Sequence, residues 1–244
     1  MNVVIFGANS EIAWECAKIY AMKGCNLFLV SRNADKLEVV ANDLAARGAG
    51  EIKKVAQDLA DIAKHRQLLD DIDKSVGEID LAFVAYGTLS DQQRCESDAA
   101  ETVNELNTNF ISAAHLLTLL GNAFEKQKRG SIAIISSVAG DRGRASNYVY
   151  GSAKAALSAF SQGLRNRLSK AGVAVLTIKP GFVDTAMTAH LPKNALFASP
   201  SSIAPAICQA IEKRKDILYT PWFWRYIMLI IKVIPEKIFK RLSL

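Results

Sequence analysis

The chain begins with the apolar run NVVIF, residues 2–6, which leads directly into the turn sequence GANSEIA, residues 7–13. A helical pattern follows to about Lys23, Gly24 ends it, and a second apolar run occupies residues 26–31. Strand, glycine turn, helix and strand within about thirty residues have the size of a dinucleotide-binding βαβ unit. The opening of the chain therefore predicts a parallel sheet with a nucleotide-binding turn after its first strand.

Short apolar runs alternate with helical patterns along the rest of the chain. The predicted strands are residues 2–6, 26–31, 51–56, 79–85, 131–136, 173–179 and 216–219, and the predicted helices are residues 10–23, 34–47, 60–76, 99–127, 150–171 and 201–214. This alternation favours one Rossmann-type α/β domain, a doubly wound parallel sheet of about seven strands with helices on both faces. We assign residues 1–220 to that domain and residues 221–244 to an apolar, basic C-terminal helical tail.

Composition excludes several classes of protein. The chain has 244 residues, half of them hydrophobic, which is enough to bury a sizeable core in a single domain. The formal net charge is +6, and residues 217–244 alone hold five basic residues and one acid. The rest of the chain has no basic stripe with interleaved aromatic residues, so we do not expect a nucleic-acid partner.

The cysteines and histidines give no sign of a metal site or a disulfide framework. Two cysteines never stand in C-x-x-C spacing, and the three histidines are scattered. The sequence starts directly with a strand and has no signal-peptide pattern. We therefore expect no metal, reduced cysteines and a cytoplasmic location. The residues concerned are Cys16, Cys25, Cys95, Cys208, His65, His115 and His190.

The strongest chemical signal is a tyrosine and a lysine four residues apart, Tyr150 and Lys154. Residues at this spacing lie on the same face of a helix, so the phenol and the ammonium can share one site. A nearby positive charge favours the phenolate and predicts a lowered pKa for Tyr150, which would make it a proton donor and acceptor near neutral pH. Ser137, thirteen residues earlier, could add a hydrogen bond to the same oxygen.

Two rivals and a simpler interpretation stand beside this prediction. Ser136 competes with Ser137, but the thirteen-residue spacing favours Ser137. Tyr148 competes with Tyr150, but the residue four positions after Tyr148 is Ser152 rather than a lysine. Taken alone, the pair could also be a surface tyrosine beside a solvated lysine.

Taken together, the landmarks resemble the short-chain dehydrogenase/reductase family, and the resemblance covers nearly the whole chain. They stand in the family order: the glycine turn from Gly7, Asp58 after the third strand, Asn109 in a long helix, Ser137, Tyr150 with Lys154, and Pro180-Gly181-Phe182-Val183-Asp184-Thr185. The resemblance implies an NAD(P)-dependent oxidoreductase that interconverts a ketone and a secondary alcohol. It also implies a homodimer or homotetramer built through the helix at 99–127 and the helix that carries Tyr150.

The resemblance implies a cofactor site that departs from the family pattern at the glycine turn and after the fourth strand, where Val84-Ala85-Tyr86-Gly87 keeps the family's glycine but not its asparagines. The family turn has three glycines, of which Gly7 is kept, whereas Glu11 and Ala13 hold the other two places. Glu11 near a phosphate would be repulsive unless its side chain turns outward. The cofactor-binding residues implied are Gly7, Asn9, Ser10, Glu11, Ile12, Ser31, Arg32, Asn33, Asp58, Gly87, Tyr150, Lys154, Pro180, Gly181, Val183 and Thr185.

The residues after the second strand bear on the choice of cofactor. NAD enzymes of the family carry an acid there, but this chain reads Ser31-Arg32-Asn33. A hydroxyl beside a guanidinium suits a 2′-phosphate, which favours NADP(H). Asp58 corresponds to the position that binds the adenine amino group, and NAD(H) remains the alternative cofactor.

The catalytic roles follow from the same resemblance. Tyr150 would donate a proton to a ketone oxygen, Lys154 would lower the phenol pKa and bind the nicotinamide ribose, and Ser137 would orient the carbonyl. Asn109 would hold a water that links Lys154 to solvent. Thr185 would bind the carboxamide, and the segment from Ala186 to Ser199 would line the substrate pocket.

The tail suggests a narrower substrate class. Residues 222–234 are apolar almost all round, too short to span a bilayer, and followed by a basic amphipathic segment. This composition fits either a helix lying on a membrane surface or a helix packed against protein. The nucleotide turn, residues 147–154 and the tail are similar to the decaprenylphosphoryl-2-keto-pentose reductases, which implies a keto-sugar on a polyprenyl phosphate at the inner face of the membrane. The alternatives are a soluble reductase of a small carbonyl or ketoacyl substrate and a non-catalytic nucleotide-binding protein.

Overall fold

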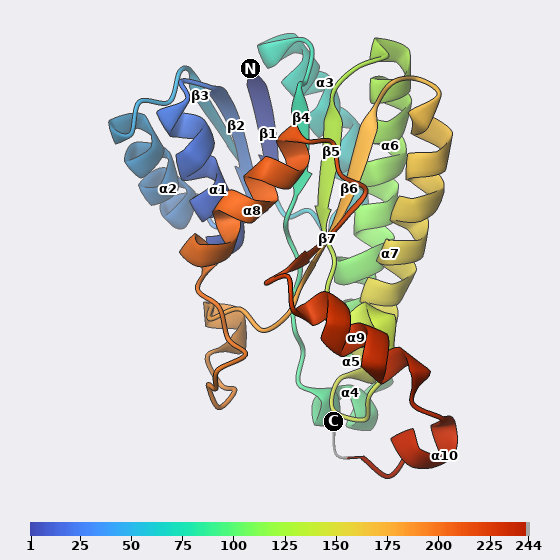
Figure 1. The fold of residues 1–244 in the computed structure, drawn as a ribbon. Helices are drawn as coiled ribbons and strands as arrows, with labels where there is room; N and C mark the ends of the chain where they lie inside the picture. The colour runs from blue at the N-terminus through green and yellow to red at the C-terminus, as the bar shows by residue number, and fades with distance from the viewer. Residues whose placement is uncertain (243–244) are drawn as a thin grey trace.

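A seven-stranded parallel sheet forms the centre of the computed structural model, which describes residues 1–242 (Figure 1). Its strand order is β3-β2-β1-β4-β5-β6-β7, and every neighbouring pair is parallel. The strands are β1 (Asn2–Phe6), β2 (Asn26–Ser31), β3 (Ile52–Ala56), β4 (Leu81–Val84), β5 (Ser131–Ile135), β6 (Ala174–Pro180) and β7 (Ile217–Thr220). The predicted Rossmann-type fold is confirmed, and each predicted strand is present.

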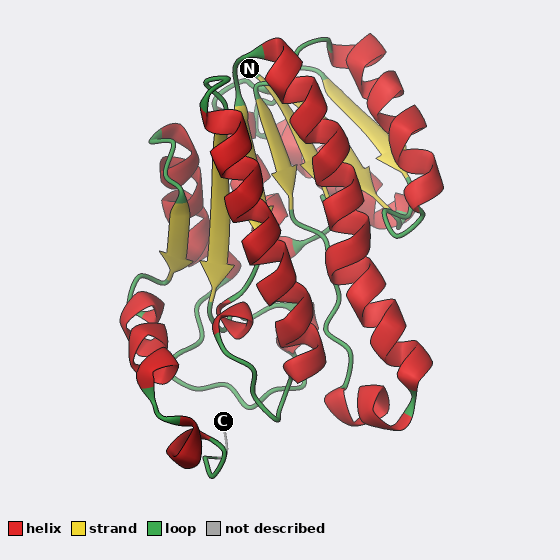
Figure 2. Cartoon of the chain, turned by 90° about the vertical axis from the view of Figure 1, so that its right-hand side faces the viewer, coloured by secondary structure: helices red, strands yellow, loops and turns green. Residues whose placement is uncertain are grey.

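Helices cover both faces of the sheet. They are α1 (Glu11–Met22), α2 (Ala34–Ala46), α3 (His65–Val76), α4 (Gln92–Ser97), α5 (Ala99–Leu106), α6 (Ser112–Gln127), α7 (Tyr148–Ser169), α8 (Pro200–Glu212), α9 (Trp224–Val233) and α10 (Glu236–Phe239), with short 3₁₀ segments η1 (Ile62–Lys64), η3 (Val138–Asp141) and η4 (Ala186–Thr188). Figure 2 views the molecule from the side of α6 and α7 and shows these two long helices side by side over the sheet.

The first strand shows why the apolar runs become buried parallel strands. Successive side chains of a strand point to opposite faces of the sheet. Val3 and Ile5 join the apolar cluster under α1, α2 and α8, whereas Val4 and Phe6 join the cluster under α3, α6 and α7. Both faces of the sheet are therefore buried, which is why the strand is apolar at consecutive positions rather than at alternate ones.

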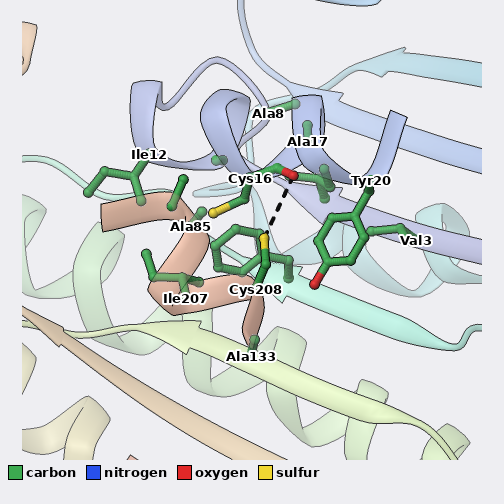
Figure 3. Packing of buried hydrophobic residues seen from close by; sticks show 14 of the residues in the cluster. Val3, Ala8, Ile12, Cys16, Ala17, Tyr20, Ala85, Ala133, Ile207 and Cys208 are labelled. Carbon is green, nitrogen blue, oxygen red and sulfur yellow. Dashed lines mark hydrogen bonds between the residues drawn. The ribbon is translucent and has the colours of Figure 1, made fainter. Parts of the chain in front are cut away.

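A sulfur-rich contact joins α1 to α8 within the first cluster. Cys16, Tyr20 and Cys208 are all buried there, and the Cys208 Sγ lies 3.9 Å from the backbone oxygen of Cys16 (Figure 3). All four cysteines of the chain are free and buried, in keeping with the expectation that they are core residues. Burial raises the pKa of the Tyr20 phenol, so this hydroxyl stays protonated.

The long helix predicted over residues 99–127 differs from the prediction in one respect. It is α5 followed directly by a π-helical turn, η2 (Asn107–Ile111), and then by α6. A π turn widens the helix locally, and such turns are frequent at functional sites. The turn contains Asn109, which is buried at the end of the sheet where the strands finish.

The C-terminal tail packs one face of α9 on its own chain. Trp224 and Met228 are buried against Val138 in η3, and Arg142 donates hydrogen bonds to the backbone oxygens of Ile231 and Ile234 at 2.6 and 2.7 Å. The opposite face is exposed, with apolar side chains at Trp222, Tyr226, Leu229, Ile230 and Val233. Helices long and apolar enough to cross a membrane are absent from the described part of the chain.

Candidate active site

A cavity of about 440 Å³ opens at the carboxyl ends of the strands, next to the point where the strand order reverses between β1 and β4. This is the place where open α/β sheets bind their ligands. The cavity is lined by residues that follow β1, β2, β3, β4, β5 and β6 in the sequence. The fold thus brings together residues separated by more than half of the chain.

The turn after β1 requires the glycine that the sequence retains. Gly7 has a φ of +92°, and a Cβ at this position would lie 2.6 Å from the backbone nitrogen of Tyr86. No side chain fits there, and L-residues disfavour that backbone conformation. The turn leads into α1. The first residues of α1 line the cavity, and the free N–H groups at a helix amino terminus suit an anionic ligand.

The two non-glycine positions of the turn have separate explanations. Ala13 is fully buried where α1 meets the sheet, so a small side chain is required but a glycine is not. Glu11 lines the cavity, and its Oε1 accepts a hydrogen bond of 3.1 Å from the backbone N–H of Ala186. The carboxylate is therefore drawn toward the segment after β6 and tethers it to the turn.

The cavity end beside β2 and β3 carries polar and basic groups. Ser31, Arg32 and Asp58 line it as predicted, and Lys36 and Gln57 line it although the sequence analysis did not select them. Asn33, which was predicted to bind the cofactor, is not among the lining residues; its side chain accepts a hydrogen bond from the Lys36 backbone N–H and caps α2. The basic pair at this end is thus Arg32 and Lys36. The sequence signal that could have identified Lys36 is its spacing of four residues from Arg32.

The catalytic triplet predicted from the sequence does meet in one place. Ser137, Tyr150 and Lys154 all line the cavity, and the Lys154 Nζ lies 5.5 Å from the centroid of the Tyr150 ring. The Ser137 Oγ accepts a hydrogen bond of 3.0 Å from the Ala139 backbone N–H, which fixes the hydroxyl just beyond the carboxyl end of β5. A strand end and one helix face therefore present the three groups to one another.

The pKa of Tyr150 differs in direction from the sequence expectation. Burial raises it to about 12, and a hydrogen bond from Ser137 opposes this rise only in part. The Lys154 ammonium lies 5.5 Å from the centroid of the Tyr150 ring and 3.5 Å from the backbone oxygen of Ile135, and burial outweighs any lowering of the Tyr150 pKa by this charge. Tyr150 is therefore held as a neutral phenol, which is the form that donates a proton.

Lys154 is itself nearly inaccessible to solvent. Burial lowers its pKa to about 8, and the negative charge of Glu105 opposes that change. Glu105 is a buried carboxylate that the sequence analysis missed, since a glutamate in a helix ordinarily faces water. Its Oε2 accepts hydrogen bonds of 2.7 Å from the hydroxyls of Thr88 and Ser90.

Asn109 lies behind the cavity wall rather than in it. Its side chain accepts a hydrogen bond of 3.2 Å from the Thr88 N–H and donates one of 3.1 Å to the Thr88 carbonyl. A Cβ on Gly87 would lie 2.5 Å from the Asn109 Oδ1 and 3.2 Å from the Lys154 Nζ, so this glycine allows both side chains to approach the loop. Asn109 therefore braces the segment after β4.

The rival residues have other partners or positions. The Ser136 hydroxyl is buried and bonded to the Ser158 hydroxyl at 2.7 Å and to the Lys154 backbone oxygen at 3.0 Å. Tyr148 is exposed on the first turn of α7 and does not line the cavity. Both arrangements favour Ser137 and Tyr150.

The segment after β6 closes the remaining side. Pro180, Gly181, Val183 and Thr185 line the cavity as predicted, followed by Ala186, Met187, Thr188 and Leu191 from the expected substrate segment. A Cβ on Gly181 would lie 1.9 Å from the Trp224 Nε1 of α9, so the glycine is needed for the tail to pack there.

Buried polar atoms without a hydrogen-bond partner indicate where in the cavity a polar ligand would bind. Among the described residues, seven buried side-chain polar atoms have no hydrogen-bond partner, and four of them belong to cavity-lining residues. Buried polar groups are otherwise almost always paired. At the basic end these atoms are the Asn9 Oδ1 and the Gln57 Nε2, which fit a polar nucleotide. His, Cys, Asp and Glu side chains in residues 1–242 form no group of three that could hold a metal ion.

The chain is similar to known proteins over most of its length. The family model described as short chain dehydrogenase matches residues 1–196. An uncharacterized oxidoreductase of Mycobacterium tuberculosis is 38% identical over 240 residues, which are 98% of this chain and 96% of the relative. An uncharacterized oxidoreductase of Streptomyces coelicolor is 31% identical over 99% of this chain and 95% of its own length.

A solved structure shares the fold. The alcohol dehydrogenase from the archaeon Thermococcus sibiricus, complexed with 5-hydroxy-NADP, has a TM-score of 0.78 and 20% sequence identity, and the match covers 89% of this chain and 94% of that one. At this identity the similarity speaks for the fold alone.

The pKa of Lys154 predicts a pH limit on dinucleotide binding. Its ammonium loses its proton as the pH rises through about 8, and the neutral amine offers no charge to a bound nucleotide. We expect the affinity for NADPH, measured by fluorescence titration on either side of this pH, to fall as the pH rises. Lys154→Arg keeps its charge and should show a flat profile.

Lys170→Arg, at the exposed C-terminal end of α7, is the matched control and should behave like the unaltered protein. An unaltered protein whose NADPH affinity does not change across pH 8 would contradict the role given to the Lys154 charge.

Proposed function

Because the chain belongs to the short-chain dehydrogenase family, we propose that its cavity is the active site of an NAD(P)-dependent oxidoreductase that interconverts a ketone and a secondary alcohol. The observation that carries the proposal is the meeting of Ser137, Tyr150 and Lys154 on one wall of a single cavity. The reduced nicotinamide supplies the hydride when bound. The chain itself has to bind the ketone, orient its carbonyl and deliver a proton.

Each of the three side chains has a separate task in this proposal. Tyr150, held as a neutral phenol, donates its proton to the carbonyl oxygen as negative charge develops there. Ser137 has its Oγ fixed by the Ala139 N–H, so its own proton is free to point at the same oxygen. Lys154 keeps a positive charge at neutral pH, 5.5 Å from the centroid of the Tyr150 ring, and stabilises the phenolate that forms when Tyr150 gives up its proton.

We propose NADP(H) as the preferred cofactor. Ser31, Arg32 and Lys36 line the end of the cavity beyond β2, and no acid occupies the position where the NAD enzymes of the family carry one. Two cations and a hydroxyl provide charge-assisted hydrogen bonds for a 2′-phosphate. NAD(H) binding remains compatible with the rest of the site, including Asp58 at the adenine position.

For the substrate we propose a ketone linked to a lipid phosphate, of which a 2-keto-pentose on a polyprenyl phosphate is the specific example. The supporting feature is α9, whose inner face packs beside the cavity while its outer face exposes Tyr226, Leu229, Ile230 and Val233. Exposed basic side chains accompany this face, among them Arg225 and Lys232. An apolar helix face with adjacent cations suits the surface of an anionic membrane.

The alternatives predict different behaviour. A soluble reductase of a small carbonyl or ketoacyl substrate would use the outer face of α9 only to pack against another subunit. Exposed Val103 and Ile111 also favour a homo-oligomer through the α5–α6 region. A non-catalytic nucleotide-binding protein would have no use for a buried phenol, serine and lysine in one cavity.

Removal of one hydroxyl tests the reaction. Tyr150→Phe keeps the ring but removes the proton donor, so NADPH oxidation over a panel of ketones should fall by at least about a hundredfold. NADPH binding, followed by fluorescence, should remain close to that of the unaltered protein. Tyr148→Phe, two residues earlier and exposed, is the control and should keep full activity. Ketone turnover at the unaltered rate in Tyr150→Phe would refute the assignment.

Removal of the basic pair tests the cofactor preference. The double variant Arg32→Ala with Lys36→Ala should weaken NADPH binding by about tenfold to a hundredfold, because charge-assisted hydrogen bonds are lost, and leave NADH binding nearly unchanged. Arg47→Ala, at the far end of α2, should change neither. Equal losses for both nucleotides would mean that the pair does not recognise a 2′-phosphate.

The outer face of α9 predicts membrane binding. The full-length protein should float with vesicles that contain phosphatidylglycerol and remain behind with vesicles of phosphatidylcholine alone. The triple variant Leu229→Ser, Ile230→Ser and Val233→Ser changes only exposed side chains and should lose flotation while it stays folded. A variant that still floats, or an unaltered protein that only forms larger oligomers in light scattering, would favour subunit packing instead.

A further inference from the structure

The substrate end of the cavity contains two partly buried polar side chains, each with one buried atom that has no hydrogen-bond partner within residues 1–242. They are Arg144, through its Nε, and Asn147, through its Oδ1. Both line the cavity, and both lie on the loop that runs from Ser137 to the start of α7. The basic end that suits the nucleotide follows β2, so these two side chains belong to a different part of the cavity.

Arg144 is a partly buried cation without an anion. No carboxylate of the described residues lies within salt-bridge distance of its guanidinium, and its one polar contact is 3.9 Å to the Met228 Sδ. The acid whose charge acts on this guanidinium is Asp141, which is already engaged by the Lys179 ammonium and by the Tyr219 hydroxyl at 2.7 Å. Burial accordingly lowers the pKa of the Arg144 guanidinium. A buried charge of this kind is costly unless a partner is supplied.

The neighbouring Arg142 shows what a satisfied arginine on this loop looks like. Its guanidinium donates to the backbone oxygens of Ile231 and Ile234 and pairs with Glu236 at 2.9 Å. Arg142 therefore fastens the tail. Arg144, two residues later on the same loop, has no such structural task and faces the cavity instead.

Asn147 gives an independent second observation. It stands at the N-cap of α7, where an asparagine side chain usually accepts a hydrogen bond from the first turn of the helix. Here the side chain makes no such bond. The backbone groups are paired: the N–H donates to the Arg144 carbonyl at 3.1 Å, and the carbonyl accepts from the Gly151 N–H at 2.8 Å. The amide is thus left free on the cavity side, three residues before Tyr150.

We propose that Arg144 and Asn147 form an oxyanion-recognition subsite for the substrate, which selects ketones that carry a phosphate or carboxylate group together with a hydroxyl. The guanidinium donates to the anionic oxygens in its fork geometry, and the Asn147 amide bonds the hydroxyl or a remaining oxygen. This inference rests on the proposed reductase function, since it names the class of ketone that the same cavity would reduce. It explains why two polar groups are buried and unpaired beside the proton donor.

Anion binding can be measured without turnover. The protein is first saturated with NADP⁺, so that the basic site beyond β2 is occupied, and is then titrated calorimetrically with inorganic phosphate and, separately, with acetate. The unaltered protein should bind at least one of the two, and the tighter one identifies the group that the substrate carries. Arg144→Gln should weaken this binding by about tenfold to a hundredfold, as expected for the loss of hydrogen bonds from a charged group.

Two further variants separate recognition from folding. Asn147→Asp has the same shape but places a like charge beside the anion, so it should also abolish phosphate binding. Arg66→Gln removes an exposed cation of α3 outside the cavity and should bind like the unaltered protein. Thermal unfolding of Arg144→Gln should occur at the same or a higher temperature, because an unpaired buried charge has been removed. A lowered unfolding temperature with unchanged phosphate binding would instead assign Arg144 a structural role and overturn the proposal.

The subsite and the reductase function fail in different ways. If reduction of ketones by NADPH depends on Tyr150 but is equally fast for neutral and anionic ketones in the unaltered protein and in Arg144→Gln, the subsite is wrong and the reductase function stands. If phosphate binding is lost in Arg144→Gln while no ketone is reduced, the anion site stands and the reaction is wrong. A rise in KM confined to anionic ketones in Arg144→Gln is the result expected when both are right.

Discussion

The burial of the parallel sheet on both faces is the constraint on which the site depends. Two apolar clusters cover the two faces, so the chain can present polar groups only where strands end. Because all seven strands are parallel, their carboxyl ends share one edge of the sheet. The reversal of strand order between β1 and β4 then leaves a gap between diverging connections, and the backbone of Tyr86 closes on Gly7 at the base of that gap.

The elements that sequence reasoning found were those with a strong local signal. β1 and β2 have the predicted bounds, because a strand that is buried on both faces is almost continuously apolar, and Gly7 directly follows β1. The short helix α4 was not predicted, since its six residues include one apolar side chain, Cys95. The π turn was also not predicted, because helical and π-helical turns use the same residue types. Both misses involve backbone choices that only tertiary packing decides.

The residues of the candidate site likewise fall into those with a local sequence signal and those that only the folded chain reveals. Tyr150 and Lys154 are four residues apart on one helix, so the sequence was enough to predict that they lie on the same face. Glu105 and Arg144 look like solvated charges in the sequence, and only the folded chain turns them toward a cavity or buries them. The direction of the Tyr150 pKa was missed for a related reason. Spacing reveals a neighbouring charge, whereas the amount of water excluded from the phenol depends on the whole fold.

The tail cannot be separated from this chemistry, although its composition sets it apart in the sequence. The loop after β5 carries Ser137 at its start, and α9 buries Trp224 and Met228 against the η3 turn of that loop. Arg142 ties the same loop to the far end of α9. A contact on the outer face of α9, by a membrane or by another subunit, would therefore act on the segment that carries Ser137 and Arg144. The inner face of α9 packs on Val138, which also lines the cavity, while the outer face of α9 is exposed. A contact at the outer face is therefore separated from the cavity by one helix.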